Sequence, residues 1–69
     1  MVVTGTVRYI DLGMGFWGIE TPEGERWRPV TLPEAYRKEG RPIRATITPL
    51  PDAATAEMWG RVCEVVVSE

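Results

Sequence analysis

Residues that could carry out catalysis are few in this chain, and their spacing does not form a catalytic site. The sequence of 69 residues contains no histidine and one cysteine, Cys63. Without a histidine to act as its base, this cysteine is expected to be an inert thiol buried in a valine-rich strand. The carboxylates Glu20, Glu23, Glu25 and Asp52 lack the paired arrangement that acid–base catalysis requires. We therefore predict that the protein is not an enzyme.

Metal and cofactor sites are not indicated either. Zinc sites draw on several Cys and His ligands, and this chain has too few of either residue to supply one. The glycine-rich segment 13–18 lacks the lysine of a phosphate-binding loop and the long helix that follows such a loop. We expect no metal and no cofactor.

Aromatic and arginine side chains are the candidates for ligand binding. In the strand-like segment Arg26-Trp27-Arg28, both guanidinium groups share one face and the indole lies on the other. Phe16 and Trp17 are consecutive, so they face opposite sides of a strand, and one of them is expected to be exposed or covered by a helix or a partner subunit. These five residues make up the predicted binding site. On one interpretation they grip a small anion or a nucleic acid, and on the other the arginines pair with neighbouring glutamates on a solvated face.

The tryptophans also have a purely structural interpretation. Three of them in so small a domain can fill the core and its rim, and this packing role is expected for Trp27 and Trp59. The exposed member of the Phe16 and Trp17 pair is then the best candidate for a contact residue.

Charge and hydropathy argue against a nucleic-acid-binding protein and against a membrane-spanning one. The net charge of −2 and the isoelectric point near 5.1 disfavour a protein that gains its affinity by neutralising phosphates. Basic residues gather only in the middle of the chain, where a solvated helix end explains them: Arg37, Lys38, Arg41 and Arg44. No apolar run approaches the roughly 20 residues that cross a bilayer, and the first residues lack a secretory signal, so a soluble cytoplasmic protein is expected.

Apolar and polar residues alternate in several segments, which predicts five β-strands. These segments span residues 2–11, 15–21, 25–28, 41–48 and 57–67. Gly5 interrupts the first segment and indicates a bend that lets one strand serve both sides of a small barrel.

One short helix is predicted between the third and fourth strands, over residues 32–39. Thr31 and Glu34 have the spacing of a capping box, and Gly40 is placed to end the helix. An apolar stripe on this helix suits it to plugging one end of a barrel: Leu32, Ala35 and Tyr36.

This order of elements predicts a single all-β domain over residues 1–69. Three strands, a short helix and two further strands match a five-stranded OB-like Greek-key barrel. An SH3-like barrel and a β-rich dimer are the alternative folds.

Two groups of proteins share motifs with this chain. Gly15-Phe16-Trp17-Gly18-Ile19, Trp27-Arg28-Pro29-Val30 and Met58-Trp59-Gly60 resemble the motifs of small OB-fold proteins of uncharacterised function. Residues 5–24 are similar to the opening of cold-shock domains, whose barrels stack single-stranded bases on surface aromatics. The second resemblance departs from the cold-shock pattern at two places. Gly18 stands where a stacking aromatic is expected, and Trp27-Arg28-Pro29-Val30 replaces the Phe-Val-His segment of the third strand.

We therefore expect a non-enzymatic binding or protein-interaction module that self-associates or binds a protein partner. The aromatic excess, the acidic charge and the valine-rich last strand, whose edge could pair with a second copy, favour this function. Single-stranded nucleic-acid binding through the second and third strands is the alternative. A role as an envelope or metal-homeostasis accessory has only distant family context in its favour.

Overall fold

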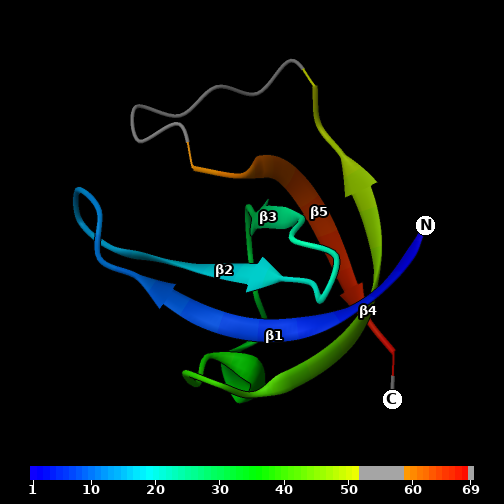
Figure 1. Ribbon diagram of the computed structural model, residues 1–69, viewed down its shortest axis with the longest axis horizontal. Coiled ribbons are helices and arrows are strands. Elements are labelled where there is room, and N and C mark those ends of the chain that lie inside the picture. Colours follow the sequence, from blue (N-terminus) through cyan, green and yellow to red (C-terminus); the bar gives the residue numbers. More distant parts are fainter. Residues whose placement is uncertain (52–58, 69) are drawn as a thin grey trace.

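The fold is described from a computed structural model, which describes residues 1–51 and 59–68. Figure 1 shows strands that curve around one another, with a short turn of helix below them. The elements are β1 (Val2–Ile10), β2 (Phe16–Glu20), β3 (Arg26–Pro29), the 3₁₀ turn η1 (Glu34–Tyr36), β4 (Pro42–Pro49) and β5 (Arg61–Val67).

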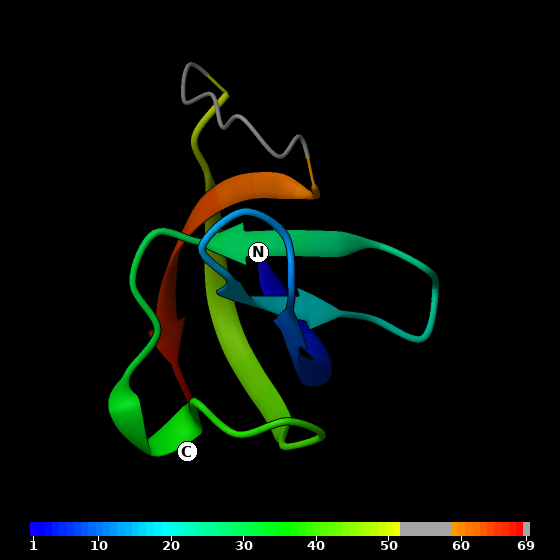
Figure 2. The ribbon, with the colours of Figure 1, turned by 90° about the vertical axis from the view of Figure 1, so that its left-hand side faces the viewer.

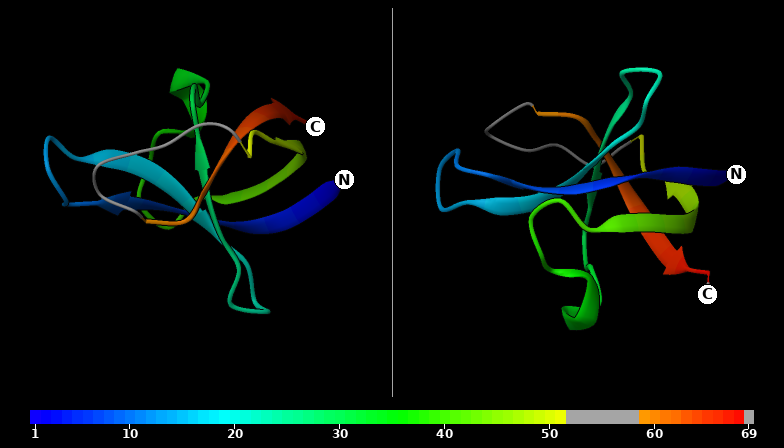
Figure 3. Two further views of the ribbon diagram at one scale, coloured as in Figure 1. Left: turned by 90° about the horizontal axis from the view of Figure 1, so that it is seen from above. Right: turned by 60° about the horizontal axis from the view of Figure 1, so that its bottom comes forward.

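The strands form a closed barrel in the order β1-β2-β3-β5-β4, and β1 pairs with β4 to complete it. Neighbouring strands are antiparallel except β3 and β5, which are parallel. The predicted five-stranded barrel is therefore confirmed, as is the position of the helical element between the third and fourth strands. The β1–β2 and β2–β3 turns project from the barrel in different directions (Figure 3).

The first strand belongs to both sides of the barrel, as its glycine predicted. Its first half pairs with β4 and its second half with β2, and Thr6 has a partner in each. A Cβ on Gly5 would lie 2.6 Å from the backbone oxygen of Glu20, so only glycine fits where the strand changes partners.

The core follows from strand alternation. Val3 and Val7 of β1, Ile19 of β2 and Trp27 of β3 point inward and are buried. The remaining strands and the segment before η1 add the other buried apolar residues: Leu32, Ile43, Ala45, Ile47 and Cys63. Burial of these side chains supplies most of the free energy that stabilises the fold.

The helix is shorter than predicted and is not capped as predicted. Only Glu34–Tyr36 are helical, and no side chain caps the turn, so the capping box of Thr31 and Glu34 does not form. Pro33 occupies the N-cap position with an extended ψ of 139°, and Leu32 before it is buried in the core. Figure 2 places η1 at one end of the barrel, where the half-buried Tyr36 packs against the core. Ala35 is exposed and no residue of η1 is buried, so the predicted apolar stripe on a helix is not formed.

The last strand begins later than predicted. It starts at Arg61, after Gly60 in a left-handed conformation with φ of 67°, and residues 57 and 58 lie outside the described part of the chain. Its edge is also less open than predicted, because β3 pairs with it over Arg61–Cys63. Within residues 1–51 and 59–68, no helix has the length and hydropathy to cross a bilayer.

Candidate interaction site

The outer surface of β2 and β3 brings aromatic rings and arginines into mutual contact. The guanidinium carbon of Arg28 lies 3.7 Å from the centre of the Phe16 ring. Phe16 meets Trp59 edge-on, with ring centres 5.7 Å apart, and the guanidinium carbon of Arg26 lies 5.8 Å from the Trp59 ring centre. These four residues are called the aromatic–arginine surface. Both of its rings are half-buried, so each keeps exposed area for a contact.

Gly18 makes room for this arrangement. It is buried in β2, and a Cβ at this position would overlap the ring of Trp59. Because glycine has no side chain, the indole of Trp59 can lie against the strand beside Phe16. A residue near the end of the chain thereby joins a surface built by β2 and β3.

Carboxylates pair with the arginines around this surface. Glu20 lies 3.4 Å from Arg8 Nε and 3.7 Å from Arg26 Nε, and Glu25 lies 3.1 Å from Arg61 Nη2. The predicted pairing of Arg26 with a neighbouring glutamate is therefore confirmed. These glutamates lower the positive potential that a phosphate backbone would meet.

Trp27 is a core residue. None of its surface is exposed, so the structure removes it from the predicted binding set and confirms the packing interpretation. Its ring is covered by the guanidinium of Arg61, whose carbon lies 4.2 Å from the ring centre.

Phe16 and Trp17 face opposite sides of β2, as predicted. Trp17 packs against the core and meets Tyr9 edge-on, with ring centres 5.2 Å apart. Phe16 lies on the outer surface with Arg28 and Trp59. Phe16, Arg26 and Arg28 therefore come together, whereas Trp17 sits at the border of their surface.

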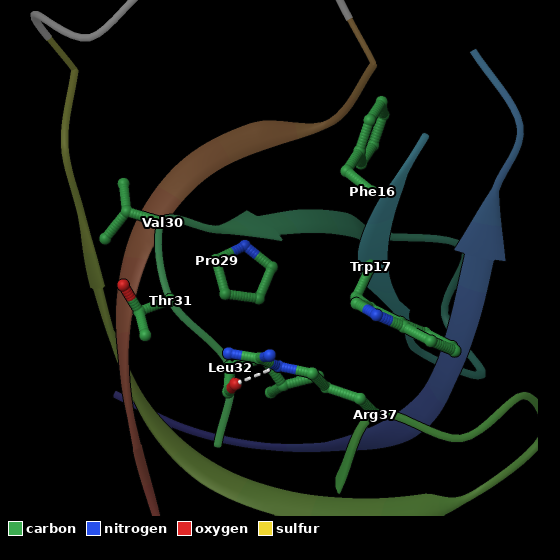
Figure 4. Close-up of a pocket in the computed structure, with 7 residues that line it drawn as sticks. All are labelled: Phe16, Trp17, Pro29, Val30, Thr31, Leu32 and Arg37. Carbon is green, nitrogen blue, oxygen red and sulfur yellow. Dashed lines mark hydrogen bonds between the residues drawn. The ribbon is translucent and has the colours of Figure 1, made fainter. Parts of the chain in front are cut away.

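A groove of about 240 Å³ adjoins this border. Figure 4 shows Phe16 and Trp17 on one side, Pro29 in the middle, and the side chain of Arg37 extending below Pro29 to the carbonyl of Leu32. Arg37 Nε donates a hydrogen bond of 2.7 Å to that carbonyl. Val30 and Thr31 also line the groove.

Glu39 and Cys63, both away from the surface, have shifted pKa values. The Glu39 carboxylate accepts hydrogen bonds from Arg8 Nη1 and from the backbone N–H of Tyr9, each 2.8 Å long, and these contacts hold the pKa of Glu39 below its usual range. Burial raises the pKa of the Cys63 thiol to about 11. A thiol that stays protonated and buried is a poor nucleophile, in agreement with the inert cysteine predicted from the sequence.

Two residues of the site were not among the predicted binding residues. The sequence predicts a packing role for Trp59 and a solvated helix end for Arg37. The small residue at position 18 was the available signal for Trp59, since a strand glycine marks the close approach of another group. No local pattern pointed to Arg37, because its groove is formed by chain segments that meet only in the folded barrel.

Comparison with family models, curated proteins and solved structures found no significant match. The resemblances to uncharacterised OB-fold proteins and to cold-shock domains therefore stay predictions, and the function has to be argued from the residues of this site.

Proposed function

We propose that this chain is a non-enzymatic OB-type barrel that binds a protein partner through its aromatic–arginine surface. The stack of Arg28 on Phe16, with Trp59 edge-on to the same ring, is the observation that carries this proposal. Aromatic residues and arginine are enriched in protein interfaces, and a few such side chains supply most of the binding energy.

Several features favour a protein partner over a nucleic acid. Arg28 already covers one face of Phe16, the face on which a base would stack. Glu20 lies between Arg8 and Arg26 and offsets their charge. The net charge of −2 further disfavours binding that depends on phosphate contacts. A protein interface tolerates such paired charges at its rim.

The test compares partner capture by matched variants. Immobilised wild-type protein, Arg28→Ala and the control Arg44→Ala are incubated with an extract of the source cells, and captured proteins are then purified and titrated individually. Arg44 is an exposed cation on β4, away from the surface. We expect Arg28→Ala to weaken binding of the purified partner about 30-fold, as for a residue that dominates an interface, and Arg44→Ala to leave it unchanged. Equal affinities for all three proteins would contradict the proposal.

Single-stranded nucleic-acid binding is the second candidate, because OB barrels bind oligomers on the outer surface of the second and third strands. Arginines and rings lie together on this surface here. Titration of tryptophan fluorescence with an oligonucleotide of about 8 nucleotides at about 50 mM salt separates the candidates. The protein-partner proposal expects no quenching, whereas saturable quenching that Arg28→Ala abolishes would favour the nucleic acid.

A further inference from the structure

We infer that the groove beside the aromatic–arginine surface binds the free carboxyl terminus of a peptide that ends in an apolar residue. This inference rests on the proposed protein-binding function and names the part of the partner that would enter the groove.

The walls of the groove are apolar. Five of the seven lining residues that the structure describes are apolar: Phe16, Trp17, Pro29, Val30 and Leu32. Val30 is exposed, and the rings of Phe16 and Trp17 are half-buried, so the walls keep apolar area that a ligand can cover. Covering this area with an apolar side chain is favourable because it removes both surfaces from water.

The charge in the groove has one sign. Among the described residues that line it, Arg37 is the one that carries a charge, and none is a carboxylate. None of the ion pairs within residues 1–51 and 59–68 involves Arg37. An anion in the groove would therefore meet a cation and no competing acid from the described lining residues.

The hydrogen bond that Arg37 already makes prepares its guanidinium for a carboxylate. Its Nε donates to the carbonyl of Leu32, which fixes the side chain along the floor of the groove (Figure 4). Arginine has five N–H donors, so the two Nη groups keep donors for a further acceptor. A planar carboxylate accepts two parallel hydrogen bonds from a guanidinium.

The volume favours a small ligand group, such as one terminal residue with its carboxylate. The groove of about 240 Å³ is smaller than the roughly 300–1,000 Å³ of sites that take drug-sized ligands. A C-terminal residue places an apolar side chain and a carboxylate on the same Cα atom, so both fit within one residue's reach. An internal aspartate or glutamate would need a second residue in the groove to supply the apolar group.

The test uses two peptides that differ only at the carboxyl group. Ac-Gly-Ser-Gly-Leu with a free carboxylate and the same peptide as its carboxamide are titrated into ¹⁵N-labelled protein, and the indole N–H signal of Trp17 is followed by NMR. We expect the carboxylate peptide to shift this signal. The carboxamide should bind at least about tenfold more weakly, since a hydrogen-bonded charge is lost. Arg37→Gln should cause a similar loss for the carboxylate peptide.

Control variants and probes keep the result interpretable. Arg44→Gln removes an exposed cation outside the groove and should bind like the wild type. Equal binding of the two peptides, unchanged binding by Arg37→Gln, or no binding of either peptide would overturn the inference. The inference would also be overturned if an oligonucleotide shifted the indole N–H signal of Trp17 and neither peptide did. A purified partner whose affinity falls in Arg28→Ala and not in Arg37→Gln would overturn this inference and leave the proposed function standing.

Discussion

Two arginine–aromatic pairs in this barrel share a geometry and differ in burial. Arg61 lies over Trp27 at 4.2 Å, and Arg28 lies over Phe16 at 3.7 Å. The ring of Trp27 has no exposed surface, whereas Phe16 is half-buried on the outside of the barrel. The same contact therefore completes a core in one place and shapes an outer surface in the other. The direction in which the strand residue points decides between the two outcomes.

The core pair is expected to respond most strongly to mutation. Trp27→Ala should destabilise the protein by about 3–5 kcal/mol, the usual cost of removing a buried aromatic side chain. One small core rarely supplies more than about 3–5 kcal/mol, so the variant should be largely unfolded in water. Urea unfolding and the dispersion of amide NMR signals measure this.

Trp27→Phe is the matched control for the core pair. It keeps an aromatic ring and removes an indole N–H that has no hydrogen-bond partner in the described structure. We expect this variant to stay folded. If Trp27→Ala unfolds at the same urea concentration as the wild type, the buried ring contributes no more to stability than a surface ring, and the contrast between the two pairs fails.

The outer pair should matter less for stability. Phe16→Ala removes one aromatic pair and one cation–π contact and should cost about 1–2 kcal/mol, with the barrel still folded. Binding of a purified partner should fall far more than stability does. If urea unfolding instead shows a loss as large as for Trp27→Ala, Phe16 is a core residue and its role as a contact is excluded.

Gly18→Ala tests how Trp59 joins the outer surface. The new methyl group overlaps the indole, so the ring must move away from Phe16 at a cost of about 0.5–1.5 kcal/mol. The ¹⁹F NMR signal of 5-fluorotryptophan at Trp59 should shift. In the Trp59→Ala background, Gly18→Ala should reduce the free energy of unfolding only slightly. An equally large reduction there would show that the methyl group disturbs the backbone of β2 rather than the indole.

The ion pair of Arg8 and Glu39 is expected to contribute least to stability among these contacts, because both side chains are exposed. The pKa of Glu39 is lower in the folded chain than its ordinary value of 4.5. Its contribution to stability is therefore complete above pH 4.5 and is lost as the pH falls through the lower, folded-state value. Glu39→Gln should flatten the decline in unfolding free energy below pH 4.5, measured by urea unfolding. An unchanged decline would assign the acid sensitivity to other carboxylates.

The barrel could be predicted from the sequence because patterns within each strand segment determine it. Alternation fixes which side of each strand is buried, and Gly5 marks the bend that lets β1 pair on both sides. The inward ring of Trp27 and the outward guanidinium groups of Arg26 and Arg28 follow from the same alternation.

The helix and half of the site could not be predicted in this way. The spacing of Thr31 and Glu34 fits a capping box, but Pro33 is extended at the N-cap position, Leu32 is buried in the core, and only a 3₁₀ turn follows. Trp59 reaches Phe16, and Arg37 reaches the groove, through contacts between segments that are distant in the sequence. Such contacts depend on how the barrel closes rather than on any local pattern.

Closure of the barrel also sets how fast the chain can find its native state. β1 pairs with β4, and β3 with β5, so two of the interfaces join segments that lie far apart along the chain. The entropy of closing those long loops must be lost before the pairings are gained, which slows folding. Although the chain has only 69 residues, we therefore expect it to fold in milliseconds to seconds, on the timescale of small β-barrels rather than of helical bundles.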